Sequence, residues 1–130
     1  MNKYNRIINK FRGKKILVVG DLILDHYVKG EVSRISPEAP VPIVLQTDSF
    51  FTPGGSANVA NNLSSLGADV TIVGLIGHDL EGGLLKRELK KRNISKEGVF
   101  TVVGHKTIVK TRIIAQHQQV VRVDREKVLA

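Results

Sequence analysis

Apolar runs and helical apolar stripes alternate along the middle of the chain. Residues 15–20 form a continuous apolar run that ends in a glycine, and the mainly apolar residues 69–76 predict another buried strand, closed by Gly77. Such runs are typical of strands buried on both faces of a parallel sheet. Residues 53–66 and 80–92 predict two helices, the first opened by a Pro-Gly-Gly-Ser segment and ended by Gly67. The order strand, helix, strand, helix predicts a right-handed parallel α/β sheet.

Each of these predicted helices has one apolar side. On the first, the stripe consists of Val59, Leu63 and Leu66. On the second, the apolar side consists of Leu84, Leu85 and Leu89, and four basic residues point outward. We therefore expect both helices to lie on the sheet through these leucine-rich sides.

The segments nearer the N-terminus contain more varied patterns. Apolar spacing predicts an amphipathic helix over residues 3–12, and alternation predicts a half-exposed strand over residues 27–35. Three prolines within residues 37–42 indicate a stiff connector, because each proline lacks a backbone donor. Residues 43–46 are expected to form only a short stretch of strand pairing.

The last third of the chain is rich in β pattern. Strands are predicted over residues 99–103, 107–115 and 119–124, with no helix between them. A turn at His117-Gln118 is expected to join the last two as an antiparallel hairpin. We therefore expect a β-rich annex attached to an α/β core, while residues 125–129 look like the start of another helix.

Composition narrows the possible classes of protein. The 130 residues are enough for one ordinary domain, and they contain no cysteine, which excludes disulfides, thiolate nucleophiles and cysteine-bound zinc. No apolar run approaches the roughly 20 residues that cross a bilayer. The basic N-terminal segment lacks the apolar core of a signal peptide, so we predict a cytoplasmic protein.

The net charge of +8 raises the alternative of a small basic nucleic-acid binder. Aromatic residues make up only 5% of the chain, and the basic residues are spread over several segments without an aromatic stacking pattern. Solvated surfaces are therefore the favoured interpretation of this charge. The four histidines have no spacing that suggests a metal site, so no metal is predicted.

The segment from Gly54 to Asn58 is the most distinctive candidate site. Gly54 and Gly55 would let a ligand approach the backbone, and they precede a helix whose free N–H groups attract oxygen-rich ligands. Asn58 adds a donor and an acceptor suited to sugar hydroxyls. A glycine-rich turn with no ligand is an equally good interpretation. The segment lacks the Gly-Lys-Ser/Thr ending of a phosphate-binding loop and is not a dinucleotide fingerprint.

Charged residues supply two further candidates. Asp21 and Asp25 follow the first buried strand, where ligands of parallel sheets bind, although Asp21 also suits a simple turn. Lys110 and Arg112 share one face of a predicted strand. Together with Arg34 and Arg122, they could converge on one anion such as a phosphate if their strands form one sheet. A solvated sheet face is the alternative.

These motifs resemble the N-terminal part of the ribokinase-like (PfkB) carbohydrate kinases. The resemblance is carried by residues 15–25, the Pro-Gly-Gly-Ser-Ala-Asn loop, Gly67 and Gly-His-Asp79. The Arg-Ile-Ser-Pro-Glu-Ala-Pro-Val-Pro stretch of residues 34–42 resembles the branch that phosphorylates D-glycero-β-D-manno-heptose 7-phosphate within bifunctional proteins of ADP-heptose synthesis. Relatives more often have alanine where this chain has Ser56, a small change.

The resemblance implies a three-layer αβα sandwich with a β-rich lid. Residues 1–14 would be a basic extension, and residues 15–130 an incomplete kinase domain whose lid strands span about 27–46 and 106–124. Sugar hydroxyls would be held by Asp25 and by the second loop, through Gly54, Gly55 and Asn58. The lid would cover the sugar and form a homodimer contact. For the 7-phosphate, charge and strand geometry make Arg34, Lys110 and Arg112 the candidates.

The family's catalytic base is an aspartate in a late Gly-Ala-Gly-Asp loop, and no such loop occurs in these residues. ATP and Mg²⁺ would belong to a complete enzyme of lipopolysaccharide core synthesis, and we expect neither to bind this chain well. Two alternatives stay open beside the kinase fragment: a non-catalytic module that binds sugar phosphate or dimerises, and the nucleic-acid binder.

Overall fold

The computed structural model describes residues 2–126, which form two sheets and three helices. The elements in chain order are α1 (Lys3–Asn9), β1 (Lys15–Val19), β2 (Leu22–Ile35), β3 (Pro42–Gly55), α2 (Ser56–Ser65), β4 (Asp69–Gly77), α3 (Leu80–Lys91), β5 (Ser95–Val102), β6 (Ile108–Ala115) and β7 (Gln118–Arg125). The predicted strand, helix, strand, helix order is confirmed in β1, α2, β4 and α3.

A parallel sheet of three strands, in the order β1-β4-β5, forms the base of the molecule. The sequence pattern predicted only two parallel strands and assigned residues 99–103 to the annex, which is wrong. The third strand starts earlier, at Ser95, and pairs in parallel with β4. The reason is the crossover through α3, which returns the chain to the neighbouring position of the same sheet.

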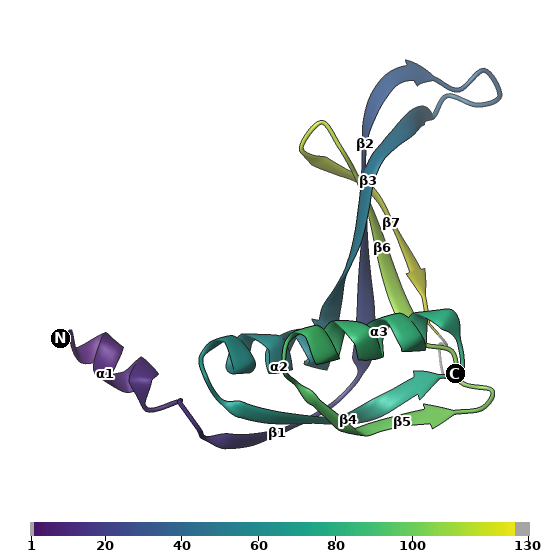
Figure 1. The fold of residues 1–130 in the computed structure, drawn as a ribbon. Coiled ribbons are helices and arrows are strands. Elements are labelled where there is room, and N and C mark those ends of the chain that lie inside the picture. Colours follow the sequence, from purple (N-terminus) through teal and green to yellow (C-terminus); the bar gives the residue numbers. More distant parts are fainter. Residues whose placement is uncertain (1, 127–130) are drawn as a thin grey trace.

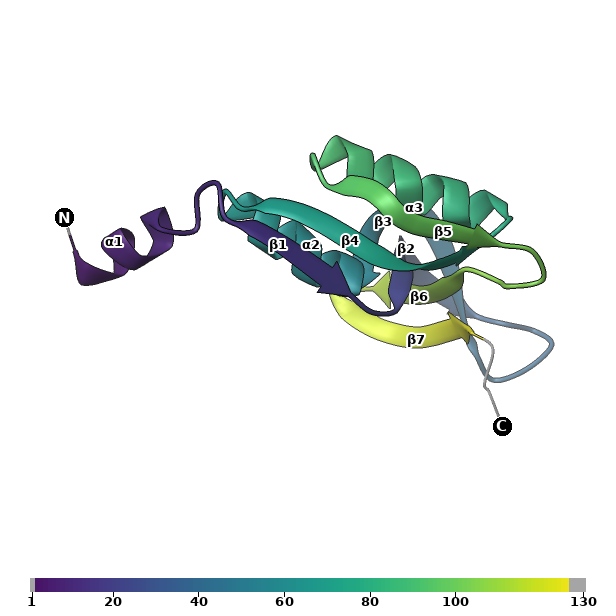
Figure 2. The same ribbon diagram turned by 90° about the horizontal axis from the view of Figure 1, so that it is seen from below.

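The helices α2 and α3 lie on the same face of this parallel sheet (Figures 1 and 2). On α3 the predicted apolar side is confirmed, because Leu85 and Leu89 are fully buried and Leu84 packs against the core. On α2 the prediction is wrong for Val59 and Leu66, which are exposed. The residues that α2 buries are small, Ala57 and Ala60, which lets the helix backbone approach the sheet closely.

The opposite face of the parallel sheet is open in the part of the chain that the structure describes. Its exposed apolar side chains are Leu17, Val19, Leu75 and Phe100, each at least half exposed. The expectation that these strands are buried on both faces is therefore not met by residues 2–126. Both helices cover the side that carries Val70 and Ile72.

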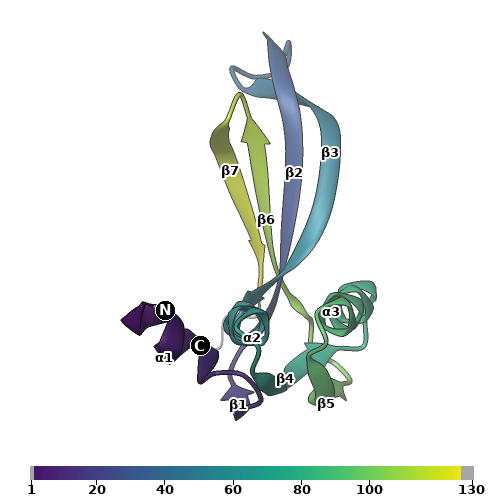
Figure 3. The same cartoon turned by 60° about the vertical axis from the view of Figure 1, so that its left-hand side comes forward.

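A second sheet rises from the side of the helices, in the strand order β3-β2-β6-β7 (Figures 1 and 3). The predicted antiparallel hairpin of the last two strands is confirmed, with its turn at Gln116 and His117. Strands β2 and β3 have 14 residues each and are much longer than predicted. Strand β3 tolerates Pro42 and Pro53 because it lies at the sheet edge.

The N-terminal helix α1 projects away from both sheets (Figures 1 and 2). It is shorter than the predicted segment of residues 3–12, and its apolar residues Tyr4, Ile7 and Ile8 are exposed. No helix within residues 2–126 is long and apolar enough to span a membrane. The further helix expected from residue 125 is not seen, since Arg125 ends β7 and residues 127–130 lie outside the described part.

Candidate functional site

The carboxylate of Asp25 lies directly against the backbone of Gly54. The two residues lie diagonally across the β2–β3 pair, in which Asp25 is the partner of Thr52 and Gly54 is the partner of Ile23. A Cβ atom at Gly54 would come within 2.6 Å of Asp25 Oδ2, so only glycine leaves room for the carboxylate there. The structure therefore brings together two residues that the sequence predicted separately.

The second glycine joins this sheet to helix α2. The glycines were expected in a loop, but they end strand β3, and α2 starts at the next residue. Gly55 has a φ of +57°, and a Cβ there would lie 2.7 Å from the carbonyl oxygen of Asp21. That same oxygen accepts hydrogen bonds from the backbone N–H of Ser56, at 3.0 Å, and from its hydroxyl, at 2.7 Å. Ser56 thus fixes the start of the helix through two hydrogen bonds. The sequence analysis considered only the small size of Ser56 and did not predict this role.

Asn58 lies in the first turn of α2, three residues after Gly55, and it is exposed. The N–H groups of this turn are the ones that an α-helix leaves without partners in its own ladder. Asn58 and the glycine pair lie at the corner where β3 passes into α2, and Gly54 brings this corner against Asp25 of β2. This corner offers both hydrogen-bond donors and acceptors, as hydroxyl groups require.

Arg112 binds the carboxylate of the same Asp25. Its Nη1 donates to Asp25 Oδ1 at 2.7 Å, although the two residues lie on different strands, β6 and β2. The hydrogen bond to Asp25 raises the pKa of Arg112 despite the opposing effect of partial burial. The guanidinium group also lies over the ring of Tyr27, 5.4 Å from its centroid. Arg112 thus has an anionic and an aromatic partner, a pairing that local sequence patterns did not indicate.

Two further cations lie beside this pair and share a single carboxylate. Lys110 is the partner of Asp25 across the parallel β2–β6 pair, and its Nζ lies 3.9 Å from Asp124 Oδ2. Arg122 reaches the same Asp124 at 2.9 Å. The sequence anticipated cations on one sheet face but not the acids among them. Asp124 was within reach of sequence reasoning, because it lies two positions after Arg122 on one strand.

Arg34 is not brought to this cluster. It is exposed, and it follows Asp25 by nine positions along the extended strand β2. At about 3.3 Å per residue, the two are separated by about 30 Å along the strand. Of the three cations proposed for a phosphate, the structure groups Lys110 and Arg112 and places Arg34 towards the far end of the hairpin.

A hydrogen-bonded clamp joins helix α3 to the second sheet at a different point. Asp79 caps α3 as predicted, accepting from the N–H of Gly82 at 2.8 Å. Its carboxylate also accepts from the hydroxyl of Thr107, at 2.6 Å, and from the Thr107 N–H, at 2.9 Å. Partial burial would raise the pKa of Asp79, but these hydrogen bonds and the charge of Arg125 lower it overall. The sequence counted Thr107 among the residues that carry the family resemblance, but it did not predict that this threonine is fully buried and bonded to Asp79.

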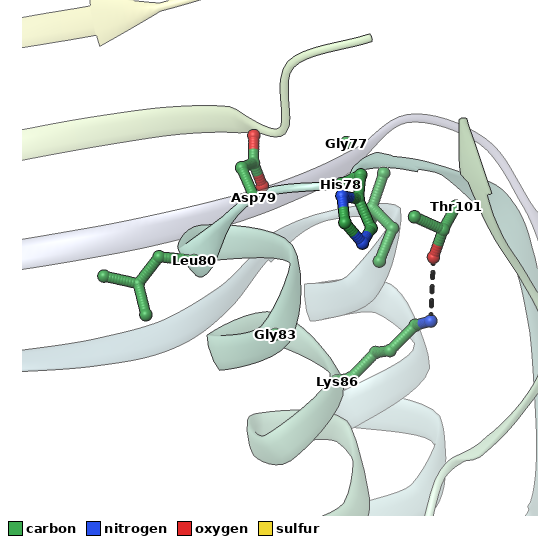
Figure 4. A pocket seen from close by; sticks show the side chains of 8 residues that line it. Gly77, His78, Asp79, Leu80, Gly83, Lys86 and Thr101 are labelled. Atoms are coloured by element: carbon green, nitrogen blue, oxygen red, sulfur yellow. Dashed lines mark hydrogen bonds between the residues drawn. The ribbon is translucent and has the colours of Figure 1, made fainter. Parts of the chain in front are cut away.

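A surface hollow of about 380 Å³ lies next to this clamp, between the β4–α3 turn and strand β5 (Figure 4). Lys86 reaches Thr101 across it, with Nζ 2.9 Å from the hydroxyl. Asp79 lines it, but none of the predicted sugar-binding residues does. Within residues 2–126, no group of three or more histidine or acidic side chains is placed to hold a metal ion.

The family model "pfkB family carbohydrate kinase" matches residues 13–130. This is most of the chain, and the chain therefore belongs to the pfkB family of carbohydrate kinases. The resemblance read from the glycine and aspartate motifs is thus confirmed.

Curated relatives are similar over almost the whole chain. The bifunctional protein HldE of Magnetococcus marinus is 49% identical over 120 residues, which are 92% of this chain and 25% of that protein. The bifunctional protein HldE of Helicobacter pylori strain P12 is 55% identical over 113 residues, 87% of this chain and 24% of that protein. The chain therefore spans about a quarter of the length of these relatives.

Solved structures confirm the expected ribokinase-like fold. A carbohydrate kinase from Agrobacterium tumefaciens matches with a TM-score of 0.69 and 26% identity, over 86% of this chain and 35% of that one. Ribokinase from Arabidopsis thaliana, solved with ribose and ATP, matches with a TM-score of 0.66 and 20% identity, over 88% of this chain and 36% of that one. The mixed α/β base with a separate rising sheet is the arrangement that they share with this chain.

Proposed function

We propose that this chain supplies the sugar-binding part of a kinase that phosphorylates D-glycero-β-D-manno-heptose 7-phosphate at O1, with ATP as donor. The observation that carries the proposal is the position of Asp25, held between Gly54 and Arg112 beside the first turn of α2. It combines an acceptor for hydroxyls with a cation for a phosphate in one place. The similarity to bifunctional HldE proteins supports the heptose as the sugar.

Different residues of this corner would bind different groups of the sugar phosphate. Asp25 would accept hydrogen bonds from sugar hydroxyls, and Asn58 would donate and accept on the side of α2. Gly54 leaves room for the carboxylate of Asp25, and Gly55 leaves room for the carbonyl of Asp21, so neither glycine places a side chain between these groups and the sugar. Lys110 and Arg112 would bind the 7-phosphate, because guanidinium and ammonium groups form charge-assisted hydrogen bonds with phosphate oxygens.

ATP and Mg²⁺ are proposed only for the longer protein. The described residues do not fit a nucleotide, because they contain neither a phosphate-binding loop ending in Gly-Lys-Ser/Thr nor a Gly-Ala-Gly-Asp loop with the family's catalytic aspartate. We therefore assign no step of phosphoryl transfer to the residues of this chain, and we expect no turnover from the chain alone. The complete enzyme would act in the cytoplasm, in ADP-heptose and lipopolysaccharide core synthesis.

The second sheet is proposed to act as a lid and as a homodimer contact. Its strands carry exposed apolar side chains that a partner could cover: Ile35, Leu45, Phe50, Val120, Val121 and Val123. Arg34, about 30 Å along the strand from Asp25, would contact a phosphate only if such a contact brought it to the site of another copy. No role for nucleic acid or membrane is proposed.

Calorimetric titration of the 130-residue chain with heptose 7-phosphate tests the proposal. We expect binding that Asn58→Ala weakens and that Asn62→Ala, an asparagine one turn further along α2, leaves unchanged. A coupled assay with ATP is expected to show no turnover. Binding without turnover is also what a non-catalytic module would give, so the same assay on the longer protein separates the two. No binding to the wild-type chain would refute the sugar site, and salt-sensitive affinity for DNA or RNA would favour the nucleic-acid alternative.

A further inference from the structure

One ion pair joins the residue proposed for the sugar hydroxyls to a residue proposed for the phosphate. Asp25 Oδ1 and Arg112 Nη1 are 2.7 Å apart, and the two side chains are only 15% and 22% exposed. The other carboxylate oxygen of Asp25 lies against Gly54, at a distance that excludes a Cβ. In the free chain, a sugar hydroxyl that approaches Asp25 must therefore compete with the guanidinium group.

This competition favours an anionic ligand. A neutral sugar that takes Asp25 leaves the guanidinium group largely buried without its counter-ion, which is strongly unfavourable. A sugar phosphate supplies another anion, and guanidinium groups bind phosphate oxygens through two parallel hydrogen bonds. The ring of Tyr27 lies under Arg112 and would keep the guanidinium group close by when it leaves Asp25.

The charges around Asp25 and Arg112 favour the binding of one additional anion. Three cations, Lys110, Arg112 and Arg122, share two carboxylates, Asp25 and Asp124. The cluster thus has an excess of positive charge. Lys110 is held loosely, at 3.9 Å from Asp124, so it is free to turn towards a phosphate.

We propose that Arg112 is a specificity-determining residue, which holds Asp25 until a phosphorylated sugar offers Arg112 a replacement anion. The exchange selects phosphorylated over neutral sugars at the same site. It rests on the proposed function, because it needs Asp25 to bind the sugar, and it adds to that function the reason why a neutral sugar is rejected.

The test compares two ligands, heptose 7-phosphate and the same heptose without its phosphate, by calorimetry on the 130-residue chain. Wild type is expected to bind the phosphorylated sugar more tightly. Arg112→Gln is expected to reduce the ratio of the two affinities by about tenfold or more, with the affinity for the neutral sugar unchanged or improved. Arg87→Gln on α3 removes the same charge elsewhere and is expected to keep the wild-type ratio. If Arg112→Gln does not fold, Arg112→Lys is used, because lysine keeps the charge but not the planar fork.

The outcomes separate this inference from the proposed function. If Arg112 only orients Asp25, both sugars lose affinity equally in the variant, and the inference is overturned while the sugar site stands. The same holds if the ratio stays at its wild-type value. If the wild-type chain binds neither sugar, the proposed function fails, and the inference fails with it.

Discussion

Thr107 and Asp79 hold each other through two hydrogen bonds, one from the Thr107 hydroxyl and one from its backbone N–H to the two carboxylate oxygens. The threonine precedes β6, and the aspartate caps α3. The hydroxyl also accepts from the N–H of Gly77, at 2.9 Å. This contact fixes the start of a strand of the second sheet to the end of a strand of the parallel sheet.

Replacing Thr107 by valine is expected to lower the free energy of unfolding by about 1–3 kcal/mol. Valine has nearly the same shape, but it leaves the N–H of Gly77 and one oxygen of Asp79 without their buried partner. Urea unfolding followed by circular dichroism measures the loss. Thr101→Val is the control, since Thr101 is exposed and bonds only the flexible Lys86. Equal stabilities for the two variants would contradict the clamp.

The clamp also predicts an acid-sensitive part of the stability. The pKa of Asp79 is lower in the folded chain than its ordinary value of 3.8. The native state therefore favours the ionised form, and the resulting stability is fully present above about pH 4 and lost as the pH falls through the folded pKa. The difference in unfolding free energy between wild type and Asp79→Asn is expected to shrink from pH 5 to pH 2. A difference that stays constant over this range would refute the prediction.

Two glycine substitutions are expected to change stability in opposite directions. Gly54→Ala places a methyl group 2.6 Å from Asp25 Oδ2, so it should displace the carboxylate from Arg112 and destabilise the chain by about 1–3 kcal/mol. Gly83→Ala, near the start of α3, meets nothing within 4 Å and should stabilise by about 0.5–1 kcal/mol. Urea midpoints measured side by side check both signs.

The open face of the parallel sheet predicts self-association of the 130-residue chain. Exposed apolar patches and unpaired strand edges promote association between copies. The double variant Leu17→Lys/Phe100→Lys, which puts one lysine on each outer strand of the open face, is expected to shift the chain towards monomer in sedimentation velocity. The control has the same two lysines at Ile7 and Ile8 of α1. If the control alone restored the monomer, α1 and not the sheet would be the associating surface.

Strands β1 and β4 of the parallel base and helix α3 could be predicted because their signals are local, whereas the parallel pairing of β5 could not. The apolar run of β4 and the leucine side of α3 are complete within their own segments, and both agree with the structure. The length of β3 was missed, because its polar residues 47–49 look like a loop. Their strand conformation depends on pairing with β2, which no single segment reveals.

In the candidate site, too, residues with local signals could be predicted, and contacts between distant segments could not. Gly54, Gly55 and Asp25 stand out in the sequence because they adjoin the ends of recognisable elements. Arg112 was also a candidate, but its pairing with Asp25 could not be predicted, since the two residues lie 87 positions apart. Ser56 was taken as a neutral replacement, because only the fold brings its hydroxyl to the carbonyl of Asp21.

The parallel pairing of β2 with β6 also sets an order for folding. Between these two neighbours the chain completes β3, α2, β4, α3 and β5, so the pairing closes a very long loop. Such non-local contacts form slowly, because the loss of chain entropy precedes the gain in contacts. The β2–β3 hairpin is therefore synthesised early. One edge of β2 stays without a strand partner until residues 108–115 have been synthesised. During synthesis, the ion pair that defines the candidate site therefore forms only after the five elements between β2 and β6 have been made.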